Sequence, residues 1–458
     1  MKKLLSLLLV SILVISLMVS CAPSTPEPDQ TDTGNTAENP ATDGADNSAD
    51  NAADTQTTTS GDGEKIVVWA WDPNFNIDIM NTAAKFYNET HPDVEFEIVE
   101  MAKADVEQKL HTNLASQLTE GLPDIVLIED YNAQKYLQSY PGSFADLTNE
   151  FNYDDFAPYK VELMTLDSKV YGVPFDSGVT GFFYRSDVLE EAGFTADDLS
   201  NITWDEFIEI GKTVKETTGK ELLSFDAIDG GLMRVMMQSA GSWYFDGDGN
   251  LNLENNDALK EAMETYKKIS DAGIIKPTSG WNDWVNAFNV GDAVSVSSGA
   301  WIIGSVKDAA DQSGNWAMAE IPRLNVSASV NSSNLGGSSW YILEGAGNKE
   351  GAIEFMKEIY AGNMDFFQEI LVNNGAVASY TPAHEGEAYA ADDEFFGGQK
   401  IYDDLSTYME GIPSINYGLY TYEADAAIMN QMLDVIDGKI TVDEAIAAAA
   451  KQLENQIS

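Results

Sequence analysis

Residues 66–71 (IVVWAW) form a short apolar run, and residues 124–128 (DIVLI) form a second one. Runs of this length and composition are typical of strands that are buried on both faces. Between them, residues 77–90 and 103–118 place apolar side chains three or four positions apart, which predicts two helices. A strand at 94–99 is predicted between the helices. Strands that alternate with helices predict an α/β fold with a parallel sheet.

Polar and aromatic side chains follow two of the predicted strands. In α/β sheets, ligands bind beyond the carboxyl ends of the parallel strands. One such loop covers residues 71–76 and the other covers residues 129–132. We therefore expect a binding site at this edge of the sheet. Its candidate residues are Trp71, Asp72, Asn74, Glu129, Asp130 and Tyr131.

The first twenty residues have the pattern of a secretion signal. Lys2 and Lys3 precede an apolar run over 4–19, which is too short to span a bilayer. The single cysteine of the chain, Cys21, follows this run, as in the signals of bacterial lipoproteins, which the segment resembles. That resemblance implies a signal peptide over 1–20 and a lipid on Cys21. The alternative is an ordinary secretion signal with an incidental cysteine.

The segment after Cys21 has an unusual composition. Residues 22–64 contain ten acidic residues but no lysine, arginine or aromatic residue. Such a segment cannot bury a core, so we predict a disordered, self-repelling tether over 21–64. A tether of this length suggests that the protein must clear a cell wall. We therefore expect it on the outer face of the cytoplasmic membrane of a Gram-positive-type envelope.

The composition of the whole chain narrows its functional class. Against 75 acidic residues there are only 25 Lys and Arg, which gives a net charge of −50. A surface of this charge repels nucleic acids and anionic lipid headgroups. One Cys and three His exclude a multi-cysteine metal site and leave little for a histidine-based one. We expect neither a metal nor another cofactor.

Further along the chain, the same alternation of elements continues. A strand is predicted at 178–185, with a helix at 187–192. Thr203 and Glu206 have the spacing of a capping box at a helix start, and Thr441 and Glu444 repeat it near the C-terminus. Trp69, Trp204 and Trp316 lie in strand or helix-start patterns, so we expect these three rings in the core.

Eight short motifs follow one another in a specific order. They are DIV at 124–126, YGVP at 171–174, FYRSDVL at 183–189, WDEF at 204–207, GAW at 299–301, GGS at 336–338, GAV at 375–377 and TVDEA at 441–445. Each motif alone is weakly specific. Their order over residues 65–458 resembles the extracellular solute-binding proteins of ABC importers, in particular the carbohydrate-binding group related to maltose-binding protein.

The resemblance implies a two-lobed, type II periplasmic-binding-protein fold whose hinge the chain crosses three times. The first crossing would fall near Asp176 and the second at Gly336 and Gly337. Glycine suits a hinge, because its backbone tolerates rotation and a close approach. The implied lobes are 65–174 with 340–395, and 177–335 with 398–458.

A sugar ligand calls for two kinds of side chain. Carboxylates and amides bind the hydroxyl groups on the rim of a sugar ring, and aromatic rings cover its C–H faces. The loops after the strands and the crossings supply carboxylates. The aromatic candidates in the second lobe are Trp243, Trp281, Trp284, Trp301, Tyr417 and Tyr420. Several aromatic residues favour an oligosaccharide over a monosaccharide.

The family function implied is capture without chemistry. The lobes would close over the sugar, and this lipid-anchored monomer would deliver it to a membrane permease. A binder of another solute, such as a polyamine or a peptide, is the first alternative. A secreted glycan-cleaving enzyme is the second, but no carboxylate pair is marked as acid and nucleophile and no common hydrolase motif is present.

Residues 246–250 (DGDGN) resemble a calcium-binding loop, with Asp257 at its twelfth position. However, Leu251 stands where such loops need glycine for a sharp turn. The two Asp-Gly pairs between apolar residues favour a β-hairpin turn instead. We therefore expect a turn here, with calcium as the alternative.

Overall fold

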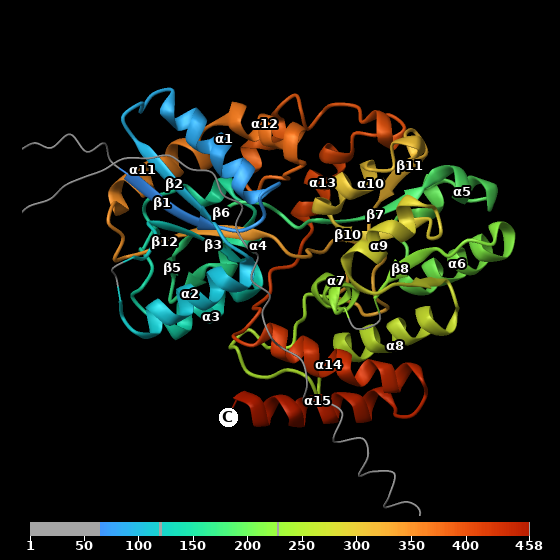
Figure 1. Cartoon of the computed structure of the whole chain (residues 1–458). Helices are drawn as coiled ribbons and strands as arrows, with labels where there is room; N and C mark the ends of the chain where they lie inside the picture. The colour runs from blue at the N-terminus through green and yellow to red at the C-terminus, as the bar shows by residue number, and fades with distance from the viewer. Residues whose placement is uncertain (1–64, 119–120, 227–228, 458) are drawn as a thin grey trace, which may run out of the picture. The chain divides into compact units, whose positions relative to one another are not determined.

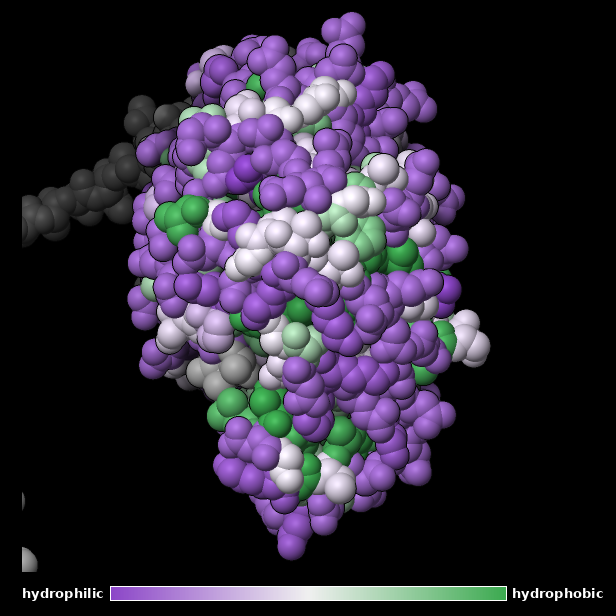
Figure 2. All heavy atoms as spheres, turned by 90° about the vertical axis from the view of Figure 1, so that its right-hand side faces the viewer, coloured by the Kyte–Doolittle hydropathy of each residue, from purple (hydrophilic) through white to green (hydrophobic). Residues whose placement is uncertain are grey.

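The computed structural model describes residues 65–118, 121–226 and 229–457. The predictions for the signal peptide, for Cys21 and for the tether lie outside these residues. Figure 1 shows strands and helices throughout the described part. No helix in that part is long and apolar enough to span a membrane. The face shown in Figure 2 is mostly hydrophilic, with a few hydrophobic patches, in keeping with the acidic composition.

A five-stranded sheet holds the first predicted strands. β1 pairs in parallel with β2 and β3, which confirms the predicted parallel α/β core. β12 comes from far along the chain and runs antiparallel between β3 and β6, an insertion that the sequence pattern did not indicate. The strands, in the order of the sheet, are β2 (Glu95–Glu100), β1 (Lys65–Ala70), β3 (Ile125–Glu129), β12 (Ser338–Ile342) and β6 (Gly172–Pro174).

Side chains of β1 alternate between two hydrophobic clusters, as the period of a strand requires. Ile66 and Val68 pack with α1, whereas Trp69 packs with α2 on the other face, so its predicted core position is confirmed. Helices therefore cover both faces (Figure 1). They are α1 (Asn76–Asn88), α11 (Lys349–Tyr360) and α12 (Met364–Asn374) on one face, and α2 (Lys103–Ala115) and α3 (Ala133–Ser139) on the other. A short helix, α4 (Pro158–Leu163), packs beside β6 at the edge of the sheet.

A second, three-stranded sheet has β7 (Thr180–Arg185) at its centre, with β10 (Ser295–Gly299) and β11 (Trp316–Ala319) antiparallel on either side. Trp204 and Trp316 are buried beside it, as predicted. Short pairs of strands are β4 (Thr165–Leu166) with β5 (Lys169–Val170), and β8 (Leu223–Phe225) with β9 (Ile275–Pro277).

The helices of this second part follow the chain in a simple order. They are α5 (Ser186–Glu191), α6 (Trp204–Thr218), α7 (Gly231–Ser239), α8 (Asp257–Asp271), α9 (Gly280–Asn289), α10 (Ile303–Lys307), α13 (Ile401–Glu410), α14 (Thr421–Ile436) and α15 (Val442–Ile457). Both predicted capping boxes are confirmed: Thr203 and Glu206 bond reciprocally at the start of α6, and Thr441 and Glu444 do so before α15.

Two local predictions have different outcomes. The helix predicted over 103–118 ends at Ala115, because Gln117 adopts a left-handed φ of 54° and the chain turns away. The turn at 246–250 is confirmed, since Phe245 and Leu251 form an antiparallel bridge. A carboxylate oxygen of Asp246 accepts the backbone N–H groups of Asp248 and Asn250 inside this turn. Among the described residues, no group of three His, Cys, Asp or Glu is placed to hold a metal ion.

The chain leaves the five-stranded sheet between β6 and β7 and returns between β11 and β12. The chain crosses from the side of the five-stranded sheet to that of the second sheet once more before α13, which packs beside β7. The first two passages run side by side, because the N–H of Leu335 donates to the carbonyl oxygen of Gly178 at 2.8 Å. A Cβ atom at position 178 would lie 2.2 Å from the carbonyl oxygen of Leu335, so the position requires glycine. The lobe boundaries given above stay a prediction.

Candidate functional site

A cavity of about 430 Å³ lies between the end of β3 and the elements around the second sheet. Its lining comes from both sheets and from the second crossing. The lining residues are Glu129, Tyr131, Leu223, Ser224, Phe225, Asp226, Asp229, Gly231, Leu232, Arg234, Gly280, Trp281, Trp284, Ser298, Trp301, Leu335, Gly336, Gly337 and Tyr422. Of the fifteen ligand-binding residues predicted from the sequence, the structure brings seven to this cavity. They are Glu129, Tyr131, Trp281, Trp284, Trp301, Gly336 and Gly337.

Three indole rings form one side of the cavity, which we call the tryptophan wall: Trp281, Trp284 and Trp301. The ring centre of Trp281 lies 5.3 Å from that of Trp284 and 5.8 Å from that of Trp301. The Nε1–H groups of Trp284 and Trp301 each donate to a backbone carbonyl oxygen at 2.8 Å, which fixes these two rings. Trp281 is 51% exposed, although it is large and apolar. A flat apolar surface is thus held open beside the cavity.

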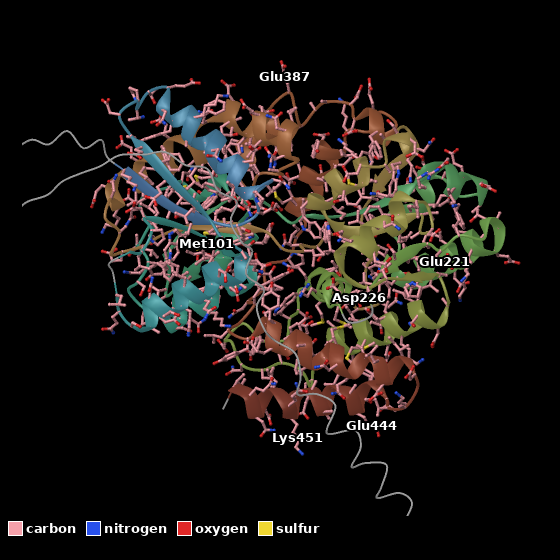
Figure 3. The ribbon with its side chains drawn as sticks, in the orientation of Figure 1. Met101, Glu221, Asp226, Glu387, Glu444 and Lys451 are labelled. Carbon is pink, nitrogen blue, oxygen red and sulfur yellow. The ribbon has the colours of Figure 1, made fainter. Side chains whose placement is uncertain are left out.

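Carboxylates stand opposite and beside this wall. Glu129 ends β3, and its carboxylate accepts from Lys103 and from the hydroxyl group of Tyr422. Asp226 and Asp229 precede the start of α7 and were not predicted; Figure 3 labels Asp226. Asp226 accepts the N–H of Gly280 at 2.9 Å, which ties this loop to the start of α9. The polar lining is therefore acidic and already oriented by the protein.

Among the described residues of the lining, Arg234 is the one cation, and the sequence did not point to it. Its guanidinium donates to Asp425 at 2.9 Å, and Asp425 also accepts the hydroxyl group of Tyr244 at 2.6 Å. Burial is the largest single influence on the pKa of Arg234 and lowers it, but the Asp425 carboxylate together with the neighbouring tyrosines outweighs burial and raises that pKa above its ordinary value. The guanidinium carbon lies 5.3 Å from the ring centre of Tyr131, within the range of a cation–π contact.

Tyr131 connects the cavity to a buried aromatic cluster. A short 3-10 helix, Asp130–Asn132, follows β3 and directs this ring toward the elements of the second sheet. The ring stacks on Trp243 at 5.7 Å and meets Tyr417 edge-on at 4.7 Å. Trp243 and Tyr417 are at most 1% exposed and do not line the cavity. These two candidates therefore support Tyr131 from behind.

Two predicted carboxylates belong to a buried polar group at the crossings, which we call the hinge cluster: Asp130, Lys160, Asp176, Ser338 and Ser339. Lys160 donates to Asp130 at 2.6 Å, and both side chains are fully buried. Asp176 accepts the backbone N–H of Ser338 at 2.7 Å. Burial raises the pKa of Asp176 to about 6. Neither Asp130 nor Asp176 lines the cavity, since both carboxylates bind the crossing segments instead.

The structure does not bring the remaining candidates to the cavity. Trp71 packs behind Glu129, against α2, and Asp72 turns its carboxylate to the N–H of Asn74 at 3.1 Å. Tyr420 directly precedes α14 and is not part of the lining, whereas Tyr422, two residues later, lies in the first helical turn and donates to Glu129. The aromatic run at 417–422 indicated the region but not which ring would reach the cavity.

Two sheets joined by paired crossing segments, with a lined cavity beside the crossings, define the class of two-lobed type II solute-binding proteins. A family model described as bacterial extracellular solute-binding protein matches residues 82–396. A lactose-binding protein of Rhizobium radiobacter is 53% identical over 400 residues, which cover 87% of this chain and 94% of the relative. The chain belongs to the bacterial extracellular solute-binding protein family, and the resemblance stated from the sequence is confirmed.

More distant relatives agree with this class. An arabinooligosaccharide-binding protein of Halalkalibacterium halodurans is 25% identical over 420 residues, or 87% of this chain and 92% of the relative. A solved extracellular solute-binding protein of family 1 superimposes with a TM-score of 0.72 at 20% identity, covering 86% of this chain and 99% of the other. The galacto-N-biose-/lacto-N-biose I-binding protein of Bifidobacterium longum gives 0.69 at 22% identity, covering 86% and 97%. At these identities the two structures support the fold alone.

Proposed function

We propose that this protein captures lactose, or a closely related neutral disaccharide, in the cavity beside the tryptophan wall. The observation that carries the proposal is the lactose-binding relative, which is 53% identical over 94% of its length. The volume of about 430 Å³ lies toward the lower end of the roughly 300–1,000 Å³ of small-molecule sites. This size favours a disaccharide over the longer oligosaccharide that the number of aromatic residues suggested.

The lining suits both the apolar faces and the hydroxyl-bearing rim of such a sugar. The rings of Trp281, Trp284 and Trp301 provide apolar surface for C–H groups, and Glu129 and Asp229 provide acceptors for hydroxyl groups. The excess of carboxylates over the single guanidinium disfavours an anionic sugar, because like charges repel in a partly enclosed site. The same acidity would attract a polyamine, which is why that alternative belongs in the binding test.

The proposed mechanism is closure around the sugar, which is later released unaltered. A ligand that contacts both sides of the cavity shifts the chain toward the closed arrangement, because only that arrangement offers both sets of contacts. The sugar-loaded monomer would then meet the permease of an ABC importer. We assign no catalytic role to any residue.

The first experiment is calorimetric titration of the full mature chain with lactose, galactose, maltose, an arabino-oligosaccharide and spermidine. We expect lactose to bind most tightly and to be recovered intact. Tightest binding of spermidine would favour the polyamine alternative, and recovery of free galactose and glucose would favour an enzyme. Binding of none of the five would overturn the proposal.

The lipid anchor is the second part of the proposal. Cys21 would carry the lipid, and residues 21–64 would hold the body away from the outer face of the membrane. Replacing Cys21 by Ala removes the only thiol of the chain, and we expect the protein to appear in the culture medium. Immunoblots of membrane and medium fractions check this. Equal retention of the variant in the membrane fraction would exclude lipidation at Cys21.

A further inference from the structure

The first turn of α14 contacts elements of the five-stranded sheet through side chains. We call these contacts the α14 latch; it consists of Lys103, Glu129, Lys135, Tyr422 and Glu423. Lys103 begins α2, Glu129 ends β3 and Lys135 lies in α3, whereas Tyr422 and Glu423 lie in α14. Helix α14 packs with α8 and α15 in the second part of the molecule. The latch therefore joins the two sides of the cavity.

The inner half of the latch joins the largely buried Glu129 carboxylate to two partly exposed side chains, Lys103 and Tyr422. The Tyr422 hydroxyl donates to the Glu129 carboxylate, which also pairs with Lys103, and the Glu129 side chain is only 17% exposed. Lys103 Nζ lies 3.3 Å from the Tyr422 oxygen and 5.2 Å from the centre of its ring. Burial and the nearby Glu129 raise the pKa of Tyr422, so its phenol stays a proton donor. Because Glu129 and Tyr422 also line the cavity, these contacts lie at the ligand.

The outer half of the latch is exposed. Lys135 Nζ lies 3.5 Å from a Glu423 carboxylate oxygen, and these side chains are 43% and 38% exposed. Salt screens an exposed ion pair of this kind. The Lys135–Glu423 pair should therefore weaken with ionic strength more than the hydrogen bond from the Tyr422 hydroxyl, whose donor is neutral.

The positions of the two lysines are not explained by helix stability. The chain has only 25 Lys and Arg for 75 acidic residues. Lys103 is the first residue of α2, and Lys135 is the third residue of α3. A cation in the first turn opposes the helix dipole, so these sites are unfavourable for the helices themselves. Lys135 pairs with the acid Glu423 of α14 across the cavity mouth, and Lys103 reaches the Tyr422 hydroxyl there. The acidic partners of Lys103, Glu107 and Glu129, lie on its own side. Contacts to α14 therefore give both placements a reason.

We propose that the α14 latch holds the cavity enclosed before the sugar arrives and makes sugar affinity depend on salt. A ligand that binds the enclosed arrangement has an apparent affinity proportional to the fraction of molecules already enclosed. Weakening the latch lowers that fraction, so binding weakens although no contact to the sugar is lost at Lys135 or Glu423. The sugar part of this inference rests on the proposed function, and the conformational part does not.

The conformational part is tested without ligand, by small-angle X-ray scattering of the full mature chain. The test variant carries Lys135→Gln together with Tyr422→Phe, which keeps the ring but removes the donor. Lys439→Gln is the matched control, because Lys439 forms an exposed pair with Asp434 near the other end of α14. We expect a larger radius of gyration for the test variant only. Superimposable profiles of test variant and wild type, with both folded by circular dichroism, would overturn the latch.

The affinity part is tested by titrating lactose at low and high salt. We expect the wild type and the Lys439→Gln control to lose about two- to fivefold in affinity at high salt, the range of one exposed ion pair. Lys135→Gln alone should be weaker at low salt and nearly insensitive to salt. An unchanged salt dependence in Lys135→Gln would overturn this part. If the wild type binds no lactose but the scattering differs as expected, the proposed function fails while the latch stands.

Discussion

The hinge cluster is polar and sealed from water, whereas the tryptophan wall, which lines the cavity, is apolar and partly open to water. Lys160 and Asp130 are fully buried, and each finds a partner within 2.6 Å. Trp281, in contrast, leaves 51% of its surface exposed. An unpaired buried charge costs free energy, and so does a large apolar side chain that stays exposed to water. The exposed tryptophan rings are therefore better candidates for ligand contact than the buried carboxylates.

The largest expected effect tests the structural role of the hinge cluster. Lys160→Met removes the partner of a buried carboxylate, so we expect the free energy of unfolding to fall by about 3–5 kcal/mol. Urea unfolding followed by circular dichroism measures it. Lys169→Met is the matched control, because Lys169 pairs with Asp146 on the surface, where losing an exposed ion pair should change the free energy of unfolding very little. Equal losses of unfolding free energy in the two variants would contradict a special structural role for the hinge cluster.

The next effect tests the wall. Trp281→Ala should weaken lactose binding by about 2 kcal/mol, as for an aromatic residue that carries binding energy. Its effect on unfolding should stay within about 0.5 kcal/mol, because the ring is half exposed. Calorimetry and urea unfolding measure the two quantities. Leu433→Ala, exposed on α14 outside the cavity lining, should change neither by much. A loss of stability without a loss of binding would assign Trp281 to the core.

The last effect concerns pH. Burial raises the pKa of Asp176 to about 6, above its ordinary value of 3.8. The folded chain therefore holds a proton that the unfolded chain has lost, and stability from this group declines as the pH rises from about 4 through about 6. Asp176→Asn keeps an acceptor for the N–H of Ser338 but does not titrate. We expect the variant to gain about 2 kcal/mol relative to the wild type over this interval. Unfolding at both pH values measures it, and parallel changes would contradict it.

Local signals predicted most of the fold. The apolar runs became β1 and β3, and both capping boxes begin the helices they indicated. The position of β12 was out of reach, because its pairing with β3 joins residues about two hundred positions apart. Hydrophobic pattern fixes which residues are buried but not which strands become neighbours.

The site was only partly predictable for the same reason. Trp281 and Trp284 were found from residue type, since large rings suit a sugar, and Trp301 was found from its residue type together with its place in the GAW motif. Tyr422 was missed, because the start of α14 decides which ring of the run at 417–422 reaches Glu129. Arg234 did leave a signal: it is the single charged residue of α7, which otherwise contains four apolar Met and Leu side chains and a Val. A charge in such a helix indicates either a buried partner or a ligand, and here it has the partner Asp425.

The pairing of the first two crossings has a mechanical consequence. The backbone of Gly178 lies so close to Leu335 that the two hydrogen-bonded segments should bend as one unit, with no room for a side chain between them. Two independent linkers could twist in many directions, but two paired linkers bend easily about one axis only. A fluorescent sugar sensor built from this protein would therefore report one swinging motion. Dyes for it belong at the rims, far from that axis.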